Sequence, residues 1–335
     1  MSDLDNKKDF LEVKNLVVEY FSGKSIVHAV NGVNLKMQKG KTLGLVGETG
    51  AGKTTIAKSI LRILPDVGAR IVQGEILLDG EDLLTLKEHD MRKIRGNEIS
   101  MIFQDPMTAL NPVQRVGEQI AEAVRLHSDM SKEECNERAK EMLRMVGITE
   151  DRFSEYPHQF SGGMKQRIVI AIALACNPQV LLADEPTTAL DVTIQAQVLE
   201  LVEDLQKKFN TSMLLITHDL GVVATACDDV AIIYAGQIVE YGTKQQIFHH
   251  PSHPYTLGLF GAIPDLVGDD EWLHPIEGLP PDPTKEIVGC AFAPRCKYAT
   301  DECFKTAVKQ ETTPDGHICA CLRLEDVLKK EDENV

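Results

Sequence analysis

Gly47-Glu48-Thr49-Gly50-Ala51-Gly52-Lys53-Thr54-Thr55 is the stretch that decides the fold of this chain, because it has the pattern G-x-x-x-x-G-K-[ST]. Apolar residues 42–46 predict a short buried strand before it, and residues 56–61 have the apolar spacing of a helix after it. In this context the glycines let backbone N–H groups surround phosphate oxygens, and the helix N-terminus adds partial positive charge. Lys53 is expected to reach the β- and γ-phosphates, and the Thr54 hydroxyl to complete a Mg²⁺ shell. The stretch predicts a nucleoside triphosphate site.

The composition is typical of a soluble globular protein. The 335 residues suffice for one large or two medium domains, and no apolar run approaches the roughly 18–20 residues that span a bilayer. The N-terminal residues 1–9 lack an apolar signal region, so we expect a cytoplasmic location. A net charge of −16 argues against broad nucleic-acid binding.

The order of apolar segments predicts an α/β fold. Helices set between apolar strands imply a largely parallel sheet that is covered on both faces. The prolines that accumulate after about residue 250 predict an appended module without long helices. We expect strands over 10–20, 27–35, 74–80 (a strand running into a turn), 180–183, 213–216 and 230–234, and helices over 116–126, 132–146 and 194–208.

Two adjacent carboxylates, Asp184 and Glu185, follow the apolar strand 180–183. The carboxyl ends of strands in a parallel sheet face the ligand crevice, so both acids are expected near the phosphate loop. Asp184 can hold the Mg²⁺ shell, while Glu185 can polarise the water that attacks the γ-phosphate. His218 ends another apolar strand and could orient that water, and Gln104 could ligate Mg²⁺ or position water.

A second anion site is suggested by Ser161-Gly162-Gly163 before a long apolar helix. A two-fold dimer with two nucleotides between facing chains would use both phosphate sites of each molecule. As structure alone, Ser-Gly-Gly is an ordinary helix start.

Together these motifs resemble the ATP-binding-cassette (ABC) ATPases, with residues 47–55 as Walker A, 180–185 as Walker B and 160–166 as the family signature. Phe160 and Met164 stand where Leu and Gln are commonest, but the Ser-Gly-Gly core is intact. The resemblance implies a P-loop ATPase core over 10–105 and 166–250, a helical subdomain over 106–165, and a small Pro/Cys-rich module over 251–335.

The resemblance also implies roles for individual residues. Tyr20 would stack on adenine, although Phe21 could take that role; Ala189-Leu190-Asp191 would be the D-loop, and Gln104 and His218 the Q-loop and switch residues. The expected catalytic pair is Glu185 and His218, and the expected Mg²⁺ ligands are Thr54, Gln104 and Asp184. The ATP-binding set is Tyr20, Glu48, Thr49, Gly50, Ala51, Gly52, Lys53, Thr54, Thr55, Gln104 and Asp184, with Ser161, Gly162, Gly163 and Asp191 binding ATP of the partner chain.

Residues 99–112, 251–256 and 278–281 look like segments of oligopeptide and dipeptide importers. The resemblance implies an ATP-hydrolysing subunit that energises peptide import, with nickel import as the nearest alternative and a nucleotide-gated regulatory protein as a rival of another class. Such a subunit would work as a homodimer or heterodimer on the inner face of the membrane. It would contact permease subunits through about 107–120 and, indirectly, a peptide-binding protein.

Five cysteines lie in the C-terminal segment: Cys290, Cys296, Cys303, Cys319 and Cys321. Their spacing fits no common zinc finger or ferredoxin run, so the residues alone leave zinc, iron–sulfur and an unliganded cluster open. The family resemblance implies a [4Fe–4S] cluster on Cys290, Cys296, Cys303 and Cys321, with Cys321 favoured over Cys319. If this site only staples the module, Cys296→Ser is expected to unfold residues 290–321 and to leave ATPase activity largely intact.

Overall fold

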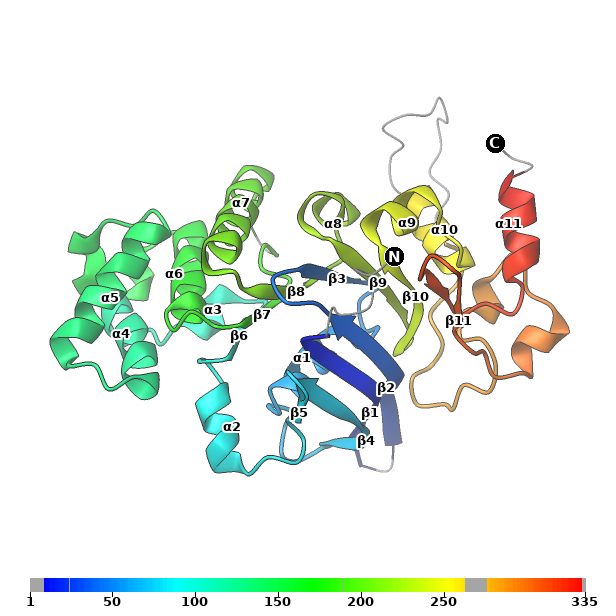
Figure 1. Ribbon diagram of the computed structural model, residues 1–335, viewed down its shortest axis with the longest axis horizontal. Coiled ribbons are helices and arrows are strands. Elements are labelled where there is room, and N and C mark those ends of the chain that lie inside the picture. The colour runs from blue at the N-terminus through cyan, green and yellow to red at the C-terminus, as the bar shows by residue number, and fades with distance from the viewer. Residues whose placement is uncertain (1–8, 24, 189, 263–275, 333–335) are drawn as a thin grey trace, which may run out of the picture. The chain divides into compact units, whose positions relative to one another are not determined.

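A computed structural model describes residues 9–23, 25–188, 190–262 and 276–332 (Figure 1). The chain divides into two compact units that interleave in sequence. Of the described residues, the first unit contains those within 1–11, 37–42 and 78–216, and the second contains those within 12–36, 43–77 and 217–335.

The first unit is built on three parallel strands in the order β6-β7-β8. These strands are β6 (Ile99–Ile102), β7 (Val180–Asp184) and β8 (Ser212–Thr217), and every residue in them is buried. The continuous burial explains why they are apolar without alternation. The short strand β5 (Glu81–Asp82) also belongs to this part of the chain.

Helices of the first unit pack on these strands and on one another. Helices α4 (Val116–His127) and α5 (Lys132–Met145) contact each other and α6 (Gly162–Leu174), which also packs on β6 (Figure 1). Ser131 and Glu134 form a capping box that fixes the start of α5. The other helical elements are α2 (Glu88–Ile94), α3 (Pro106–Ala109), α7 (Val192–Phe209) and the 3₁₀ turns η1 (Glu150–Ser154) and η2 (Pro157–Gln159).

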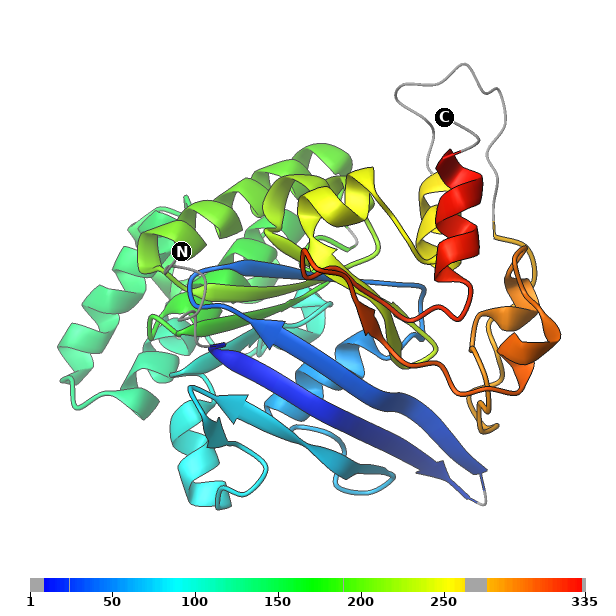
Figure 2. The same ribbon diagram turned by 45° about the vertical axis from the view of Figure 1, so that its right-hand side comes forward.

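The second unit contains most of two sheets. In the first, β1 (Leu11–Ser22) lies between β2 (Ser25–Met37) and β4 (Ala69–Leu78), and Figure 2 shows β1 and β2 side by side. In the second, β3 (Thr42–Val46) pairs in parallel with β9 (Asp229–Tyr234), and β10 (Gln237–Thr243) pairs antiparallel with β9. Helices α1 (Lys53–Ile60), α8 (Leu220–Ala226) and α9 (Lys244–His249) complete this part.

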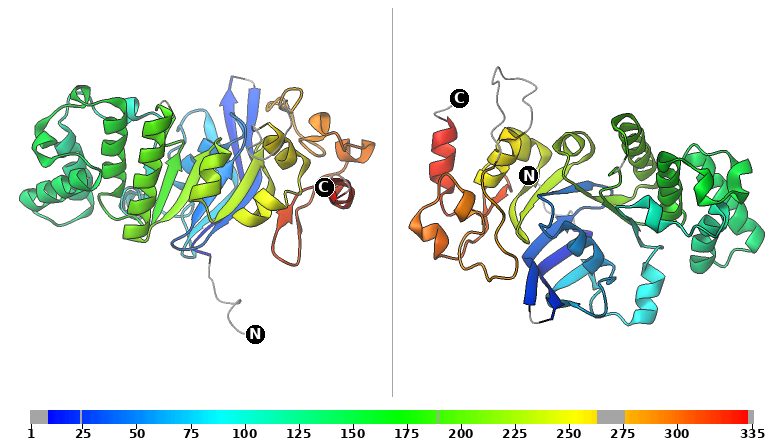
Figure 3. Two further views of the ribbon diagram at one scale, coloured as in Figure 1. Left: turned by 90° about the horizontal axis from the view of Figure 1, so that it is seen from above. Right: turned by 180° about the vertical axis from the view of Figure 1, so that it is seen from behind.

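The C-terminal segment extends the second sheet. Strand β12 (Ile318–Cys319) pairs with β10, and β11 (Glu311–Thr312) pairs with β12. Figure 3 shows this segment beside α10 (Pro254–Gly261) from two further directions. The remaining elements are η3 (Ala293–Arg295), η4 (Asp301–Phe304) and α11 (Leu324–Asp332). All of them are short, as the prolines predict.

The predicted strands and helices are confirmed, with ends shifted by a few residues. Helix α1 begins at Lys53 rather than at residue 56, because the loop glycine Gly52 stands at its N-cap position. Helix α7 begins at Val192, because the Asp191 carboxylate accepts a hydrogen bond from the Ile194 amide at 3.0 Å and caps it.

Candidate nucleotide site

The phosphate loop of the second unit joins β3 to α1, as predicted, and two of its glycines are fixed by close approach. A Cβ at Gly47 would lie 2.2 Å from the carbonyl oxygen of Ile233. A Cβ at Gly52, where φ is +101°, would lie 2.4 Å from the carbonyl oxygen of Ala29. Any other residue at these positions would displace backbone, so the sequence pattern is a steric requirement of this loop.

The buried Lys53 side chain folds back over the loop. Its Nζ donates to the carbonyl oxygens of Gly47 at 2.7 Å and of Glu48 at 3.1 Å. An ammonium held against the loop backbone at the start of α1 is placed to interact with a phosphate that the loop amides receive.

Tyr20, rather than Phe21, approaches this loop. The Tyr20 hydroxyl lies 3.3 Å from Thr55 Oγ1, whereas Phe21 is exposed. His218 is exposed at the end of β8, and the next residue, Asp219, caps α8 through the amides of Gly221 and Val222.

In the first unit, Gln104 and Glu185 meet. Gln104 Nε2 donates to Glu185 Oε2 at 2.9 Å, and Thr188 Oγ1 donates to the same oxygen at 3.0 Å. Asp184 is buried at the end of β7, and Glu185 has a φ of +46°, an uncommon value for a side-chain-bearing residue. The parallel pairing of β6 with β7 thus brings together Gln104 and the acidic pair.

The signature residues begin α6. Ser161 is its N-cap, with Oγ accepting from the Met164 amide at 3.4 Å, and Ser161 and Gly162 are exposed while Gly163 is half-buried. Gln166 Nε2 donates to the carbonyl oxygen of Pro186 at 2.6 Å, so the signature helix is tied to the turn after Glu185. Asp191 is also exposed, and Ala189 of the predicted D-loop lies outside the described residues.

Four thiols of the C-terminal segment line one small cavity, and they are the four named from the sequence: Cys290, Cys296, Cys303 and Cys321. Cys319 is absent from that lining and is buried in β12. Burial raises the pKa of Cys290 and of Cys296, and it raises the pKa of Cys321 to about 11. Within the described ranges, no three Cys, His, Asp or Glu side chains stand together in an arrangement that could hold a metal ion.

Sequence reasoning missed a contact between this segment and the phosphate loop. Arg295 Nη1 donates to both carboxylate oxygens of Glu48 at 3.0 Å and to the Tyr234 hydroxyl at 3.2 Å. The partners are 247 residues apart, and no periodic pattern relates them.

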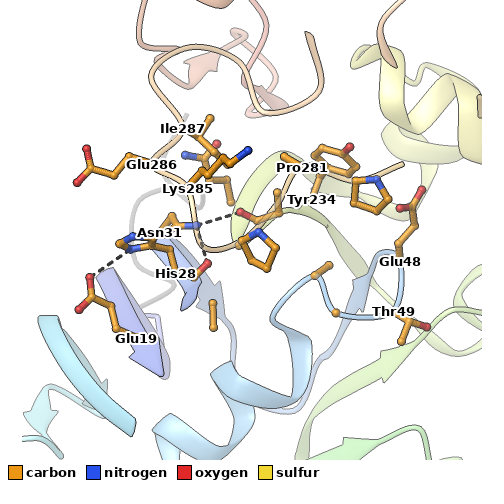
Figure 4. A pocket seen from close by; sticks show the side chains of 18 residues that line it. Glu19, His28, Asn31, Glu48, Thr49, Tyr234, Pro281, Lys285, Glu286 and Ile287 are labelled. Atoms are coloured by element: carbon orange, nitrogen blue, oxygen red, sulfur yellow. Dashed lines mark hydrogen bonds and ion pairs between the residues drawn. The ribbon is translucent and has the colours of Figure 1, made fainter. Parts of the chain in front are cut away.

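A cavity of about 470 Å³ beside the loop was also missed (Figure 4). On one side, His28 Nδ1 lies 3.2 Å from Glu19 Oε1, and the His28 amide donates to the carbonyl oxygen of Pro283 at 2.8 Å. The walls come from β1, β2, the phosphate loop, the β9–β10 turn and the segment 280–287. Tyr20 does not line this cavity, so it is separate from the expected adenine contact.

Two family models match the chain. The model described as "ABC transporter" matches residues 30–188, and the model described as "Oligopeptide/dipeptide transporter, C-terminal region" matches residues 239–303. The oligopeptide transport ATP-binding protein AppD of Bacillus subtilis is 51% identical over 94% of this chain and 97% of its own length. The dipeptide transport ATP-binding protein DppD of the same organism is 49% identical, with 93% of each chain covered.

Solved structures of ATP-binding cassettes also resemble this chain. A dimeric ATP-binding cassette bound to ADP and Pi in a post-hydrolysis state superposes with a TM-score of 0.63 and 29% identity. It covers 70% of this chain and 98% of its own. A cassette of a cbiONQ transporter complex from Clostridium perfringens gives a TM-score of 0.61 at 26% identity, covering 72% of this chain and 91% of its own.

Proposed function

Because this chain belongs to the ATP-binding proteins of ABC transporters, we propose that it hydrolyses Mg-ATP to energise the import of dipeptides or oligopeptides. The observation that carries the peptide assignment is the near full-length match to an oligopeptide transport protein, which includes the C-terminal region. The fold is the α/β fold of an ABC ATPase, and its glycine loop and Lys53 supply the phosphate chemistry.

In this proposal Lys53 and the loop amides bind the triphosphate, Thr54 and Asp184 hold Mg²⁺, and Tyr20 stacks on the base. Glu185 polarises the attacking water, and Gln104 and His218 position it. The hydrogen bond between Gln104 and Glu185 supports their assignment to one task. The bond orients the carboxylate of Glu185, since the amide of Gln104 donates to it.

The exposed Ser161-Gly162 start of α6 and the exposed Asp191 support a dimer in which these residues bind the partner's ATP. The segment 107–120 supports docking to a membrane subunit, because Met107 is 61% exposed and Val113 is 82% exposed. Among the described residues, no helix combines the length and hydropathy that a bilayer crossing requires. Peripheral attachment to the inner face of the membrane through such a subunit is part of the proposal, because the relatives are transport ATP-binding proteins.

We also propose that the four thiols that line one cavity hold a [4Fe–4S] cluster, with zinc as the alternative. The donor type fits, because both groups are bound by Cys thiolates, and Cys321 rather than Cys319 lines the cavity with the other three. The thiols do not form a metal-holding group as they stand, so binding requires them to converge. A bound group would staple a segment that has little core of its own. Anaerobic purification with an absorption spectrum and analysis of iron, sulfide and zinc tests this point: a protein without bound metal would refute it.

The test of hydrolysis is Glu185→Gln. We expect kcat to fall roughly 10²–10⁴-fold, because a general base is removed while the phosphate loop is untouched. ATP binding should persist and ATP-dependent dimers should accumulate. Glu200→Gln, a matched change at an exposed position of α7, is expected to leave turnover unchanged. Equal turnover of wild type and Glu185→Gln would contradict the assignment of the base.

The test of cargo is uptake by a strain from which the gene is deleted. We expect loss of labelled di- or oligopeptide uptake, restored by the wild-type gene but not by Glu185→Gln. Loss of nickel uptake with peptide uptake intact would favour the nickel importer instead. Normal uptake of both would favour the regulatory alternative.

A further inference from the structure

An ion pair joins the phosphate loop to the cysteine segment through the carboxylate of Glu48. Arg295, in the residue position before Cys296, places one guanidinium nitrogen 3.0 Å from both oxygens of Glu48. The Arg295 side chain is 6% exposed and that of Glu48 is 28% exposed. The pair is thus largely shielded from solvent. A charge-assisted hydrogen bond contributes more stabilisation in such a place than on an open surface.

Arg295 is itself held in place by three other groups. Its Nε donates to the carbonyl oxygen of Glu277 at 3.0 Å, and Nη2 donates to that of Ile276 at 3.2 Å. Nη1 also donates to the Tyr234 hydroxyl. A guanidinium fixed by backbone and phenol in this way presents its charge to Glu48 in one geometry.

The backbone of Glu48 is held from the same side. Its amide donates to the Tyr255 hydroxyl at 3.1 Å. The rings of Tyr234, Tyr255 and Phe292 pack with centroids 4.6–5.4 Å apart, which fixes that hydroxyl. Arg295 therefore bonds the side chain of Glu48, and Tyr255 bonds its backbone amide.

Glu48 poses an electrostatic problem for a loop that binds a triphosphate. Its carboxylate lies in the chain next to Thr49 and the amides that would face phosphate oxygens. An uncompensated negative charge there would repel a ligand that carries several negative charges. The Arg295 guanidinium compensates that charge, and it does so from a segment remote in sequence.

We propose that Arg295 is a positioning residue for ATP binding, which neutralises Glu48 and holds the phosphate loop, and thereby couples the cysteine segment to the nucleotide site. This inference rests on the proposed binding of ATP at that loop. It assigns Arg295 no contact with the nucleotide. The effect is therefore on the dissociation constant of ATP rather than on the chemical step.

The test is a double-mutant cycle on the purified full-length chain, with the Kd of Mg-ATP and Mg-ADP as readouts. Arg295→Ala is expected to raise the Kd of ATP roughly tenfold, because it leaves the Glu48 carboxylate unpaired. The increase should be larger for ATP than for ADP, since repulsion grows with ligand charge. Adding Glu48→Gln to Arg295→Ala should bring the Kd back to within about twofold of wild type, because the repulsive charge is gone.

Two further variants complete the design. Arg295→Lys keeps the charge but loses the other guanidinium contacts, and an intermediate Kd is expected. Lys305→Ala removes a positive charge from an exposed position of the same segment and should not change the Kd. If Arg295→Ala fails to fold, Glu48→Gln alone still tests the inference. It should lower the Kd of ATP, because the Arg295 charge then lies unpaired near the phosphates.

The outcomes separate this inference from the proposed function. Wild type that binds no ATP would refute the proposed function. Wild type that binds ATP while Arg295→Ala has the same Kd would overturn the inference alone. So would a loss in Arg295→Ala that Glu48→Gln does not relieve, because the role of Arg295 would then be packing.

Discussion

His253, the N-cap residue of α10, makes the stability of the folded chain depend on pH in the acid range. Its side chain is 1% exposed, and Nδ1 accepts a hydrogen bond from the Tyr255 amide at 3.0 Å, which caps α10. Burial lowers the pKa of His253 from 6.5 to about 4, although the Glu240 carboxylate and a hydrogen bond to the backbone of Ala320 oppose the shift. The imidazole is therefore neutral in the folded protein at pH 7.

The size of the effect follows from the two pKa values. Between pH 6.5 and pH 4 the unfolded chain binds a proton at His253 that the folded chain does not bind, so acid favours unfolding. The stabilisation is present above the unfolded pKa and is lost as the pH falls toward the folded pKa. Linkage gives a loss of about 2 kcal/mol by pH 5 and about 3 kcal/mol by pH 4, relative to pH 7.

The assay is urea unfolding of wild type and His253→Asn between pH 4 and pH 7.5. Asn retains an oxygen that can cap the helix but does not titrate. We expect the difference in unfolding free energy, wild type minus variant, to shrink by about 3 kcal/mol from pH 7 to pH 4. His249→Asn, at an exposed position, is the matched control for loss of an imidazole. A difference that stays constant, or that grows as the pH falls, would refute the reasoning.

Two further predictions concern the loop and the thiols. Gly47→Ala should abolish ATP binding, because its Cβ would lie 2.2 Å from the Ile233 carbonyl oxygen; nucleotide titration measures this. The control is Gly316→Ala, at a position with φ +84° and no heavy atom within 4 Å of an added Cβ. It should add only backbone strain and leave ATP binding unchanged. The reduced, metal-free chain should lose stability as the pH rises from 9.0 toward 11, because burial raises the pKa of Cys321 to about 11 and the folded state then binds the extra proton. The thermal midpoint of wild type should fall over this range more steeply than that of Cys321→Ser, and parallel curves would contradict the prediction.

The sequence predicted elements whose pattern is local. Strands β7 and β8 have continuous apolar runs over 180–183 and 213–216, and the helices α4 and α5 have a clear apolar face. Their limits were therefore found to within two residues. The approach of Gln104 to Glu185 was also predictable, because it follows from parallel strands that end at the same edge.

Other features depend on long-range packing and left no such pattern. Strands β11 and β12 are only two residues each, too short for alternation to be read. The choice between Cys319 and Cys321 depends on which side chain faces the shared cavity. Cys319 ends β12 and Cys321 lies two residues further on, so the spacing alone does not show which of them does so. The pairing of Glu48 with Arg295 belongs to the same class.

This pairing predicts a different outcome for one variant that was considered from the sequence. Independence of the cysteine segment predicts that Cys296→Ser unfolds residues 290–321 and leaves ATPase activity largely intact. In the structure, Arg295 immediately precedes Cys296 and Phe292 packs on Tyr255, so the groups that hold Glu48 belong to that segment or pack on it. Unfolding of the segment would release the carboxylate beside the phosphate loop. The Kd of ATP should therefore rise in Cys296→Ser, as it is expected to rise in Arg295→Ala. Adding Glu48→Gln should relieve both defects, because the same unpaired charge would cause them.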